Sequence, residues 1–161
     1  MIFGEINLIF SETDNIKLIA EALSKLEYDK SLQLLTQAEK IYYLSADIQY
    51  HRGLYYSLTG DVDMALSAFT EAGDLDETFA PAFYNQAFIQ HSKNELELAK
   101  SLYKKTLDID NEFLNALNNL GTIYLYEKNY DQAKVYFQKC LEIAPDHHFA
   151  KENLDKIKIE N

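Results

Sequence analysis

Residues 114–145 read LNALNNLGTIYLYEKNYDQAKVYFQKCLEIAP. Apolar and small residues recur at helical intervals on both sides of a polar break: Leu117, Leu120, Gly121 and Tyr124 before it, and Tyr130, Ala133, Phe137, Cys140 and Leu141 after it. This spacing places each set on one face of an α-helix. Because Glu127–Asn129 is short and polar and Pro145 closes the second set, the segment predicts a helical hairpin.

The same pattern returns every 34 residues along the chain, without a gap. Equivalent positions hold similar side chains, as in the columns Ser31, Ala65, Ala99, Ala133 and Leu35, Phe69, Tyr103, Phe137. A period of this length indicates one small unit that buries its apolar face by stacking on its copies. Small residues at Gly53, Ala87 and Gly121 let the two helices of a hairpin approach closely, and the bulky column then fills the space between hairpins.

The run Leu117, Leu120-Gly121, Tyr124, Ala133, Phe137 and Pro145 resembles a tetratricopeptide repeat (TPR), with leucine where the commonest pattern has tryptophan. The resemblance covers residues 12–145 as four repeats, 12–45, 46–79, 80–113 and 114–145. It implies an all-α fold, a right-handed α-solenoid of four TPR-like helical hairpins plus a C-terminal capping helix. Residues 146–161 supply that helix, with Asp146 as its expected N-cap and Phe149, Leu154 and Ile157 covering the last hairpin.

Residues 1–11 form an apolar N-terminal extension or cap. Ile2, Phe3, Ile6 and Ile9 fit a helical stripe, whereas Ile2, Gly4, Ile6, Leu8 and Phe10 alternate as in a strand. The segment therefore either caps the first hairpin or associates two copies of the chain, which makes a homo-oligomer through residues 1–10 the alternative function. The cap is favoured because monomers rarely leave such patches bare.

Composition limits the classes of function. A net charge of -11 argues against nucleic acid as a partner, because phosphate binding needs clustered lysine and arginine. The segment 1–10 is too short to cross a bilayer and no cation precedes it, so we expect no membrane insertion and a cytoplasmic protein.

Cys140 lies on a core stripe and is interpreted as a packing residue. No phosphate loop or nucleophile motif is present, and His147-His148 has no third metal ligand nearby. We expect no enzyme activity, no cofactor and no metal.

The resemblance implies a peptide-binding groove on the concave side, lined by the first helix of each repeat. Helical geometry places these residues there: Tyr50, His51, Leu54, Tyr84, Asn85, Phe88, Asn115, Asn119, Thr122 and Tyr126. One column, His51, Asn85, Asn119 and Asn153, offers three carboxamides that can pair with a peptide backbone or instead bond to solvent or within their helices. The sequence thus predicts a scaffold or chaperone-like adaptor for an unidentified protein or peptide partner.

Four polar residues occupy the stripe that should face inward, namely Gln49, Arg52, Gln86 and Gln90. Buried polar groups need partners, or each costs about 1 to 3 kcal/mol. We expect Arg52 and Gln86 to bond to each other and to nearby carboxylates or carbonyls, in preference to a polar seam that admits a ligand group.

Overall fold

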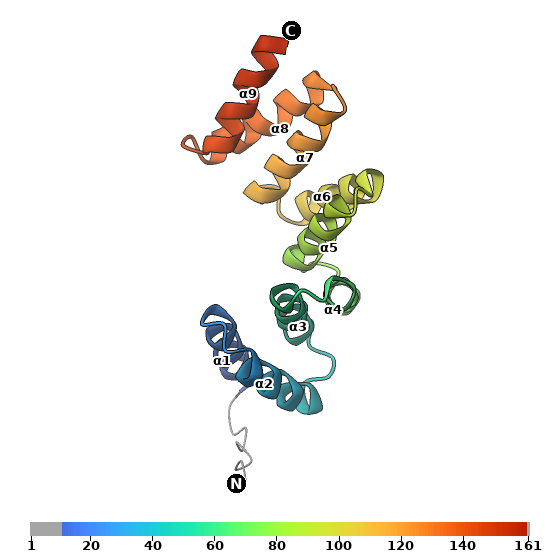
Figure 1. Ribbon diagram of the computed structural model, residues 1–161, viewed down its shortest axis with the longest axis vertical. Coiled ribbons are helices and arrows are strands. Elements are labelled where there is room, and N and C mark those ends of the chain that lie inside the picture. The colour runs from blue at the N-terminus through green and yellow to red at the C-terminus, as the bar shows by residue number, and fades with distance from the viewer. Residues whose placement is uncertain (1–10, 161) are drawn as a thin grey trace. The chain divides into compact units, whose positions relative to one another are not determined.

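The computed structural model describes residues 11–160, and throughout that range the chain forms helices joined by short turns (Figure 1). In chain order the helices are α1 Glu12–Ser24, α2 Tyr28–Ile41, α3 Ala46–Thr59, α4 Val62–Leu75, α5 Ala80–Ser92, α6 Leu96–Ile109, α7 Leu114–Tyr126, α8 Tyr130–Ile143 and α9 His148–Glu160. The predicted all-α solenoid fold of helical hairpins with a final capping helix is confirmed. The expectations for residues 1–10 lie outside the described residues.

The turn inside each hairpin bends at a residue in the left-handed backbone conformation. These residues are Leu26, Gly60, Asn94 and Lys128, with φ between 57° and 87°, and they are again 34 apart. In the first turn the Leu26 N–H donates to the Leu23 carbonyl at 3.0 Å, and the Glu27 N–H donates to the Ala22 carbonyl at 2.9 Å. This Schellman arrangement satisfies carbonyls that the helix end leaves unpaired, so the turn geometry repeats with the sequence.

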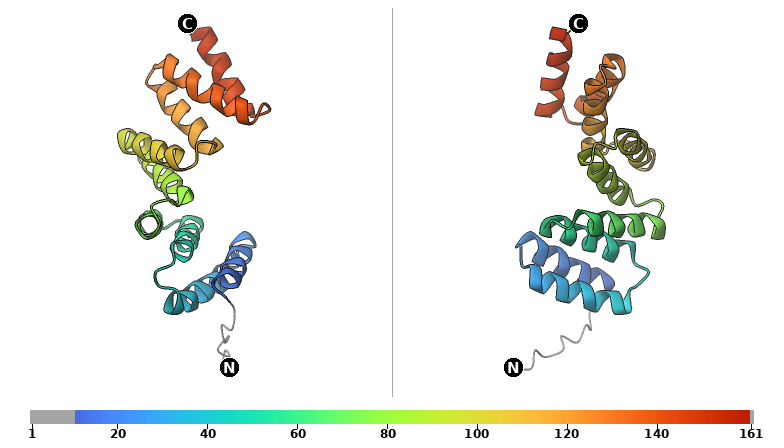
Figure 2. Two further views of the ribbon diagram at one scale, coloured as in Figure 1. Left: turned by 180° about the vertical axis from the view of Figure 1, so that it is seen from behind. Right: turned by 45° about the vertical axis from the view of Figure 1, so that its right-hand side comes forward.

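The chain divides into two compact units, and the boundary between them lies between Ala82 and Phe83 in the sequence. The N-terminal unit contains α1 to α4, and α1 contacts both α2 and α3 while α3 packs along α4 (Figure 2). Its core combines Ile19, Ala22, Leu23, Leu34, Leu35, Ala38 and Ile48. Between α3 and α4 the Phe69 ring lies directly on the helix backbone at Gly53, where an added Cβ would stand 2.5 Å from two ring carbons.

The C-terminal unit repeats this packing twice. Tyr103 of α6 is fully buried in a cluster with Ala87, Ala116, Leu120 and Ile123. Phe137 of α8 is fully buried over Gly121, with 2.8 Å between a ring carbon and an added Cβ. The predicted columns of small and bulky residues therefore describe how α5 to α8 pack.

Helix α9 covers the last hairpin through Ala150 and Ile157, both fully buried, and Leu154 packs against the same cluster. Phe149 was also predicted to lie in this contact, but its side chain is 62% exposed. The predicted N-cap of α9 was wrong. The Ala150 N–H donates to the His147 Nδ1 atom at 3.2 Å, because the helix begins at His148 and His147, not Asp146, directly precedes it. Cys140 is buried in the same cluster, and burial raises the pKa of its thiol, so this residue packs as a neutral side chain.

Candidate functional site

The ten predicted groove residues fall on three first helices of repeats. Tyr50, His51 and Leu54 lie on α3 in the N-terminal unit, and the remaining seven lie on α5 and α7 in the C-terminal unit. We call those seven residues the α5–α7 face: Tyr84, Asn85, Phe88, Asn115, Asn119, Thr122 and Tyr126.

In the N-terminal unit, one of the three predicted groove residues, Tyr50, packs against other rings, and the other two, His51 and Leu54, border a hollow. The half-buried Tyr50 ring packs against two aromatic rings, 5.7 Å from the Phe69 ring and 5.2 Å from the Phe79 ring between centroids. A hollow of about 440 Å³, the α1–α3 hollow, is lined chiefly by Ala20, Leu23, Leu26, His51, Leu54 and Leu58. Its wall is apolar, so it suits an aliphatic or aromatic side chain.

His51 is held in place within this hollow. Its Nδ1 atom lies 2.8 Å from the Asp47 carbonyl oxygen one helical turn earlier, so Nδ1–H donates to that carbonyl. The imidazole is 9% exposed and contributes mainly one wall of the hollow. This bond within α3 fixes the orientation of the His51 ring in the wall of the hollow.

In the C-terminal unit Asn119 ties two tyrosines together. Its Nδ2 group donates to the Tyr84 hydroxyl at 3.4 Å and to the Tyr103 hydroxyl at 3.2 Å. These hydrogen bonds link α7 to α5 and α6, and they differ from the solvent-facing or intrahelical bonding that the sequence suggested. The bonded residues are 35 and 16 positions apart in the chain, separations that the helical and repeat periods do not predict. The Asn119 Oδ1 atom makes no hydrogen bond to residues 11–160 and remains available as an acceptor.

Burial sets the protonation states around Asn119. It raises the pKa of the Tyr103 hydroxyl, an effect that the Asn119 hydrogen bond partly offsets, so this hydroxyl is neutral across the physiological range. Burial also lowers the pKa of His91, whose ring meets Tyr103 edge-on at 6.3 Å. The imidazole of His91 and the phenol of Tyr103 are therefore both uncharged at neutral pH.

Aromatic rings extend from this bonded centre to the surface. Tyr84 stacks on Phe113 at 4.9 Å and on Phe88 at 6.4 Å between ring centroids. Phe88 itself is 53% exposed, and Tyr126 on α7 is 76% exposed. The α5–α7 face thus presents two large exposed aromatic side chains beside a fixed amide.

The other polar residues of the face take different positions. Asn115 is exposed and Asn85 is half-buried. The Thr122 hydroxyl donates to the Asn118 carbonyl at 2.8 Å, so it bonds within its own helix. Thr122 and Tyr126 also border a hollow of about 260 Å³ between α7 and α9, together with Asn153 from the predicted column. The Asn118 Oδ1 atom is buried and has no hydrogen-bond partner among residues 11–160, a feature that the sequence did not indicate.

The inward polar residues of α3 bond to one carboxylate. Arg52 forms an ion pair with Glu39 of α2, and the Gln49 amide donates to the same Glu39 oxygen at 3.4 Å. Arg52 also lies over the Tyr56 ring, 5.7 Å from its centroid. Bonding of Arg52 to a nearby carboxylate is confirmed, and its partner lies on α2.

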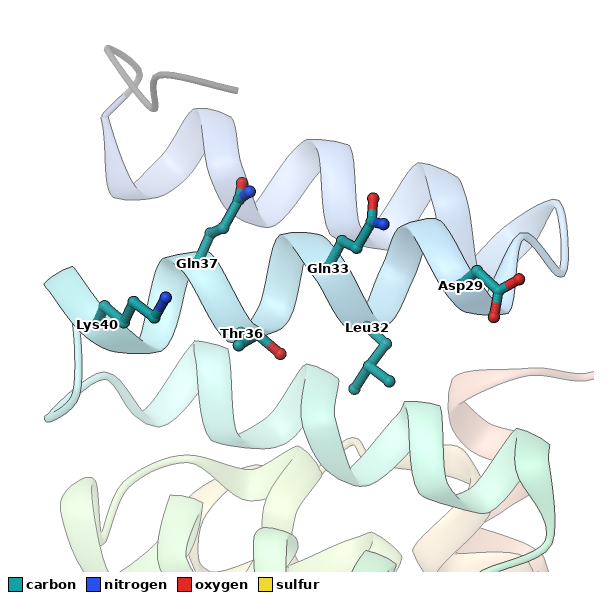
Figure 3. Close-up of a pocket in the computed structure, with 6 residues that line it drawn as sticks. All are labelled: Asp29, Leu32, Gln33, Thr36, Gln37 and Lys40. Atoms are coloured by element: carbon teal, nitrogen blue, oxygen red, sulfur yellow. The ribbon is translucent and has the colours of Figure 1, made fainter. Parts of the chain in front are cut away.

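A depression on α2 is lined by Asp29, Leu32, Gln33, Thr36, Gln37 and Lys40 (Figure 3). Figure 3 shows Gln33 and Gln37 extending toward α1, with Leu32 on the opposite side of the helix. Within residues 11–160, no group of three or more histidine, cysteine, aspartate or glutamate side chains is arranged to hold a metal ion, and none of the helices is long and apolar enough to span a bilayer.

Replacing Asn119 with alanine should lower the free energy of unfolding by roughly 1 to 2 kcal/mol, because the buried Tyr103 hydroxyl loses its hydrogen bond. Urea unfolding followed by circular dichroism measures this change. The control Asn115→Ala removes an exposed carboxamide from the same helix and should cost no stability. Equal stability of the two variants would contradict the bridging role of Asn119.

Family models of the tetratricopeptide repeat match residues 46–79, 80–113 and 114–147. No curated protein sequence matches the chain significantly. Among solved structures, the MamA protein is 18% identical with a TM-score of 0.78, over 92% of this chain and 81% of that one. PilF of Pseudomonas aeruginosa is 19% identical with a TM-score of 0.83, over 92% and 68% respectively. The first TPR domain of Spaghetti (RPAP3), bound to the HSP90 peptide SRMEEVD, is 21% identical with a TM-score of 0.68, over 72% and 92%.

Proposed function

Because the chain belongs to the tetratricopeptide repeat family, a class of protein-interaction scaffolds, we propose that it holds an extended peptide of a partner protein on the α5–α7 face. The observation that carries this proposal is the exposure of Phe88 and Tyr126 beside the anchored amide of Asn119. The bound peptide in the Spaghetti structure supports it, since that structure shares the fold.

The face combines apolar area with a preorganised acceptor. Aromatic side chains supply most of the binding energy at interfaces, and Phe88 is held by stacking on Tyr84. The Asn119 Nδ2 hydrogen bonds orient its amide, so Oδ1 accepts a peptide N–H without first losing rotamer freedom. One such hydrogen bond contributes roughly 0.5 to 1.5 kcal/mol, which orients a peptide, while the aromatic rings supply affinity.

The chemistry of the face also indicates the kind of peptide. None of its seven residues is lysine or arginine, so it has no cation to pair with carboxylates of the sort carried by SRMEEVD. We therefore expect a peptide with an apolar or aromatic side chain opposite Phe88, whose backbone N–H groups are free to donate. The partner protein would present such a segment in an unfolded or exposed region.

Selection of random peptides displayed on phage against the full chain tests this function. Peptides recovered in this way should bind the Phe88→Ser and Tyr126→Ser variants at least about tenfold more weakly, a loss of about 1.4 kcal/mol each. Fluorescence anisotropy with the labelled peptides measures the affinity.

The matched control is Phe149→Ser on α9, because Phe149 is 62% exposed but lies outside the α5–α7 face. Its affinity for the selected peptides should equal that of the original chain. A peptide that loses affinity only with Phe149→Ser, or with none of the three variants, would place the binding surface elsewhere.

A further inference from the structure

Leu26 occupies a backbone conformation that its side chain disfavours. Its φ is 57°, in the left-handed region where the Cβ atom of a residue other than glycine crowds the following carbonyl. The equivalent turns use Gly60, Asn94 and Lys128. Glycine and asparagine adopt this conformation readily. The first turn is therefore more strained with Leu26 than it would be with glycine or asparagine at this position.

Burial does not compensate for this strain. The Leu26 side chain is 56% exposed, although leucine normally occupies a strained position only when packing holds it there. It lines the α1–α3 hollow together with Leu54 and Leu58, and Leu58 is itself 47% exposed. The strained residue therefore enlarges an open apolar surface, which points to an apolar occupant.

We propose that residues 1–10 of the same chain are that occupant. Their sequence, MIFGEINLIF, carries six large aliphatic or aromatic side chains after Met1, and Ile2, Ile6, Leu8 and Phe10 alternate so that an extended segment presents them on one side. A soluble protein rarely exposes two large apolar surfaces to solvent when they can contact each other. Docking of one in the other removes both surfaces from solvent.

The chain is long enough for this contact. Ser11 caps the start of α1, and the hollow begins at Ala20, nine residues further, which is about 14 Å along the helix. Ten extended residues span about 33 Å, so residues 2 to 6 reach the hollow when the segment runs back along α1. Thr13, Lys17, Ala20 and Ser24 are all exposed and form a stripe that such a path would follow.

Tethering favours the same chain over a second copy. A segment joined directly to α1 is present at an effective concentration in the millimolar range, far above that of another molecule in dilute solution. The docked segment would cover His51 and Leu54, which line the hollow. Docking of this kind requires nothing from the α5–α7 face, so the two proposals succeed or fail separately.

Photo-crosslinking of the full chain tests the contact. With Phe3 replaced by benzoylphenylalanine, irradiation should join position 3 to peptides that contain Leu23, Leu26, Leu54 or Leu58, in a product with the mass of one chain. A product with the mass of two chains would assign the segment to a second copy. Crosslinks confined to any other part of the surface would overturn the proposed location.

The substitution Leu26→Asn separates docking from folding. It should reduce the crosslink to α3 at least about fivefold while the thermal midpoint stays the same or rises, because asparagine tolerates the left-handed turn. The matched control, Lys128→Asn, changes the equivalent turn of the fourth repeat and should leave the crosslink unchanged. An undiminished crosslink in Leu26→Asn, or a lower thermal midpoint, would show that Leu26 serves the fold and not the contact.

Discussion

Replacement of Phe137 by alanine is expected to lower the free energy of unfolding by about 3 to 5 kcal/mol. The ring is fully buried and packs among Leu117, Cys140, Ala150 and Ile157, which belong to α7, α8 and α9. Its loss leaves a cavity that the surrounding helices cannot fill, because the backbone at Gly121 offers no side chain to move into the space. The result would be a loosened C-terminal hairpin and a detached α9.

Urea unfolding and amide hydrogen exchange together measure this effect. Stacked repeats open in parts, so exchange should accelerate in α7 to α9 more than in α1 to α4. Val135→Ala on the same helix is the control, because Val135 is 43% exposed and its truncation should change stability by less than about 0.5 kcal/mol. A loss below about 1 kcal/mol for Phe137→Ala would mean that the ring is not a central element of this core.

Replacement of Gly53 by alanine should destabilise the protein by roughly 2 to 3 kcal/mol, although alanine favours helices by up to about 1 kcal/mol over glycine. The new methyl group would stand 2.5 Å from the Phe69 ring, well inside contact distance, so α3 and α4 must separate or the ring must leave its rotamer. Steric overlap of this size outweighs the gain in helix propensity. Thermal unfolding followed by circular dichroism measures whether Gly53→Ala raises or lowers the stability.

Two further variants isolate the cause. Phe69→Leu shortens the opposing side chain, so the double variant with Gly53→Ala should be less destabilised than the sum of the single changes. Ala87→Gly alters the equivalent position of the third repeat, where a methyl group is already accommodated. It should cost about 1 kcal/mol through helix propensity, and the loss of a fully buried methyl group adds to that cost. A stabilising Gly53→Ala would contradict the close approach of α3 and α4.

The repeat period predicted most of the fold because each repeat contacts only its neighbours. Columns such as Gly53, Ala87, Gly121 and Phe69, Tyr103, Phe137 describe local packing, which recurs whenever the spacing recurs. The candidate site was predicted only in part. Helical periodicity predicts that Phe88, Asn119 and Tyr126 lie on one side of α5 and α7. It does not indicate that the half-buried ring of Tyr50 also packs against Phe69 and Phe79.

The sequence by itself determined the helical hairpins, their 34-residue period and the identity of the packed columns, because these follow from short-range spacing and from volume. Only the tertiary structure decided which polar groups bond to one another, such as Asn119 with Tyr84 and Tyr103, and Arg52 with Glu39. It also decided that Leu26 is strained and exposed beside an apolar hollow. The physical reason is that hydrogen bonds and surface hollows depend on distances between side chains of different helices, which no periodicity along the chain encodes.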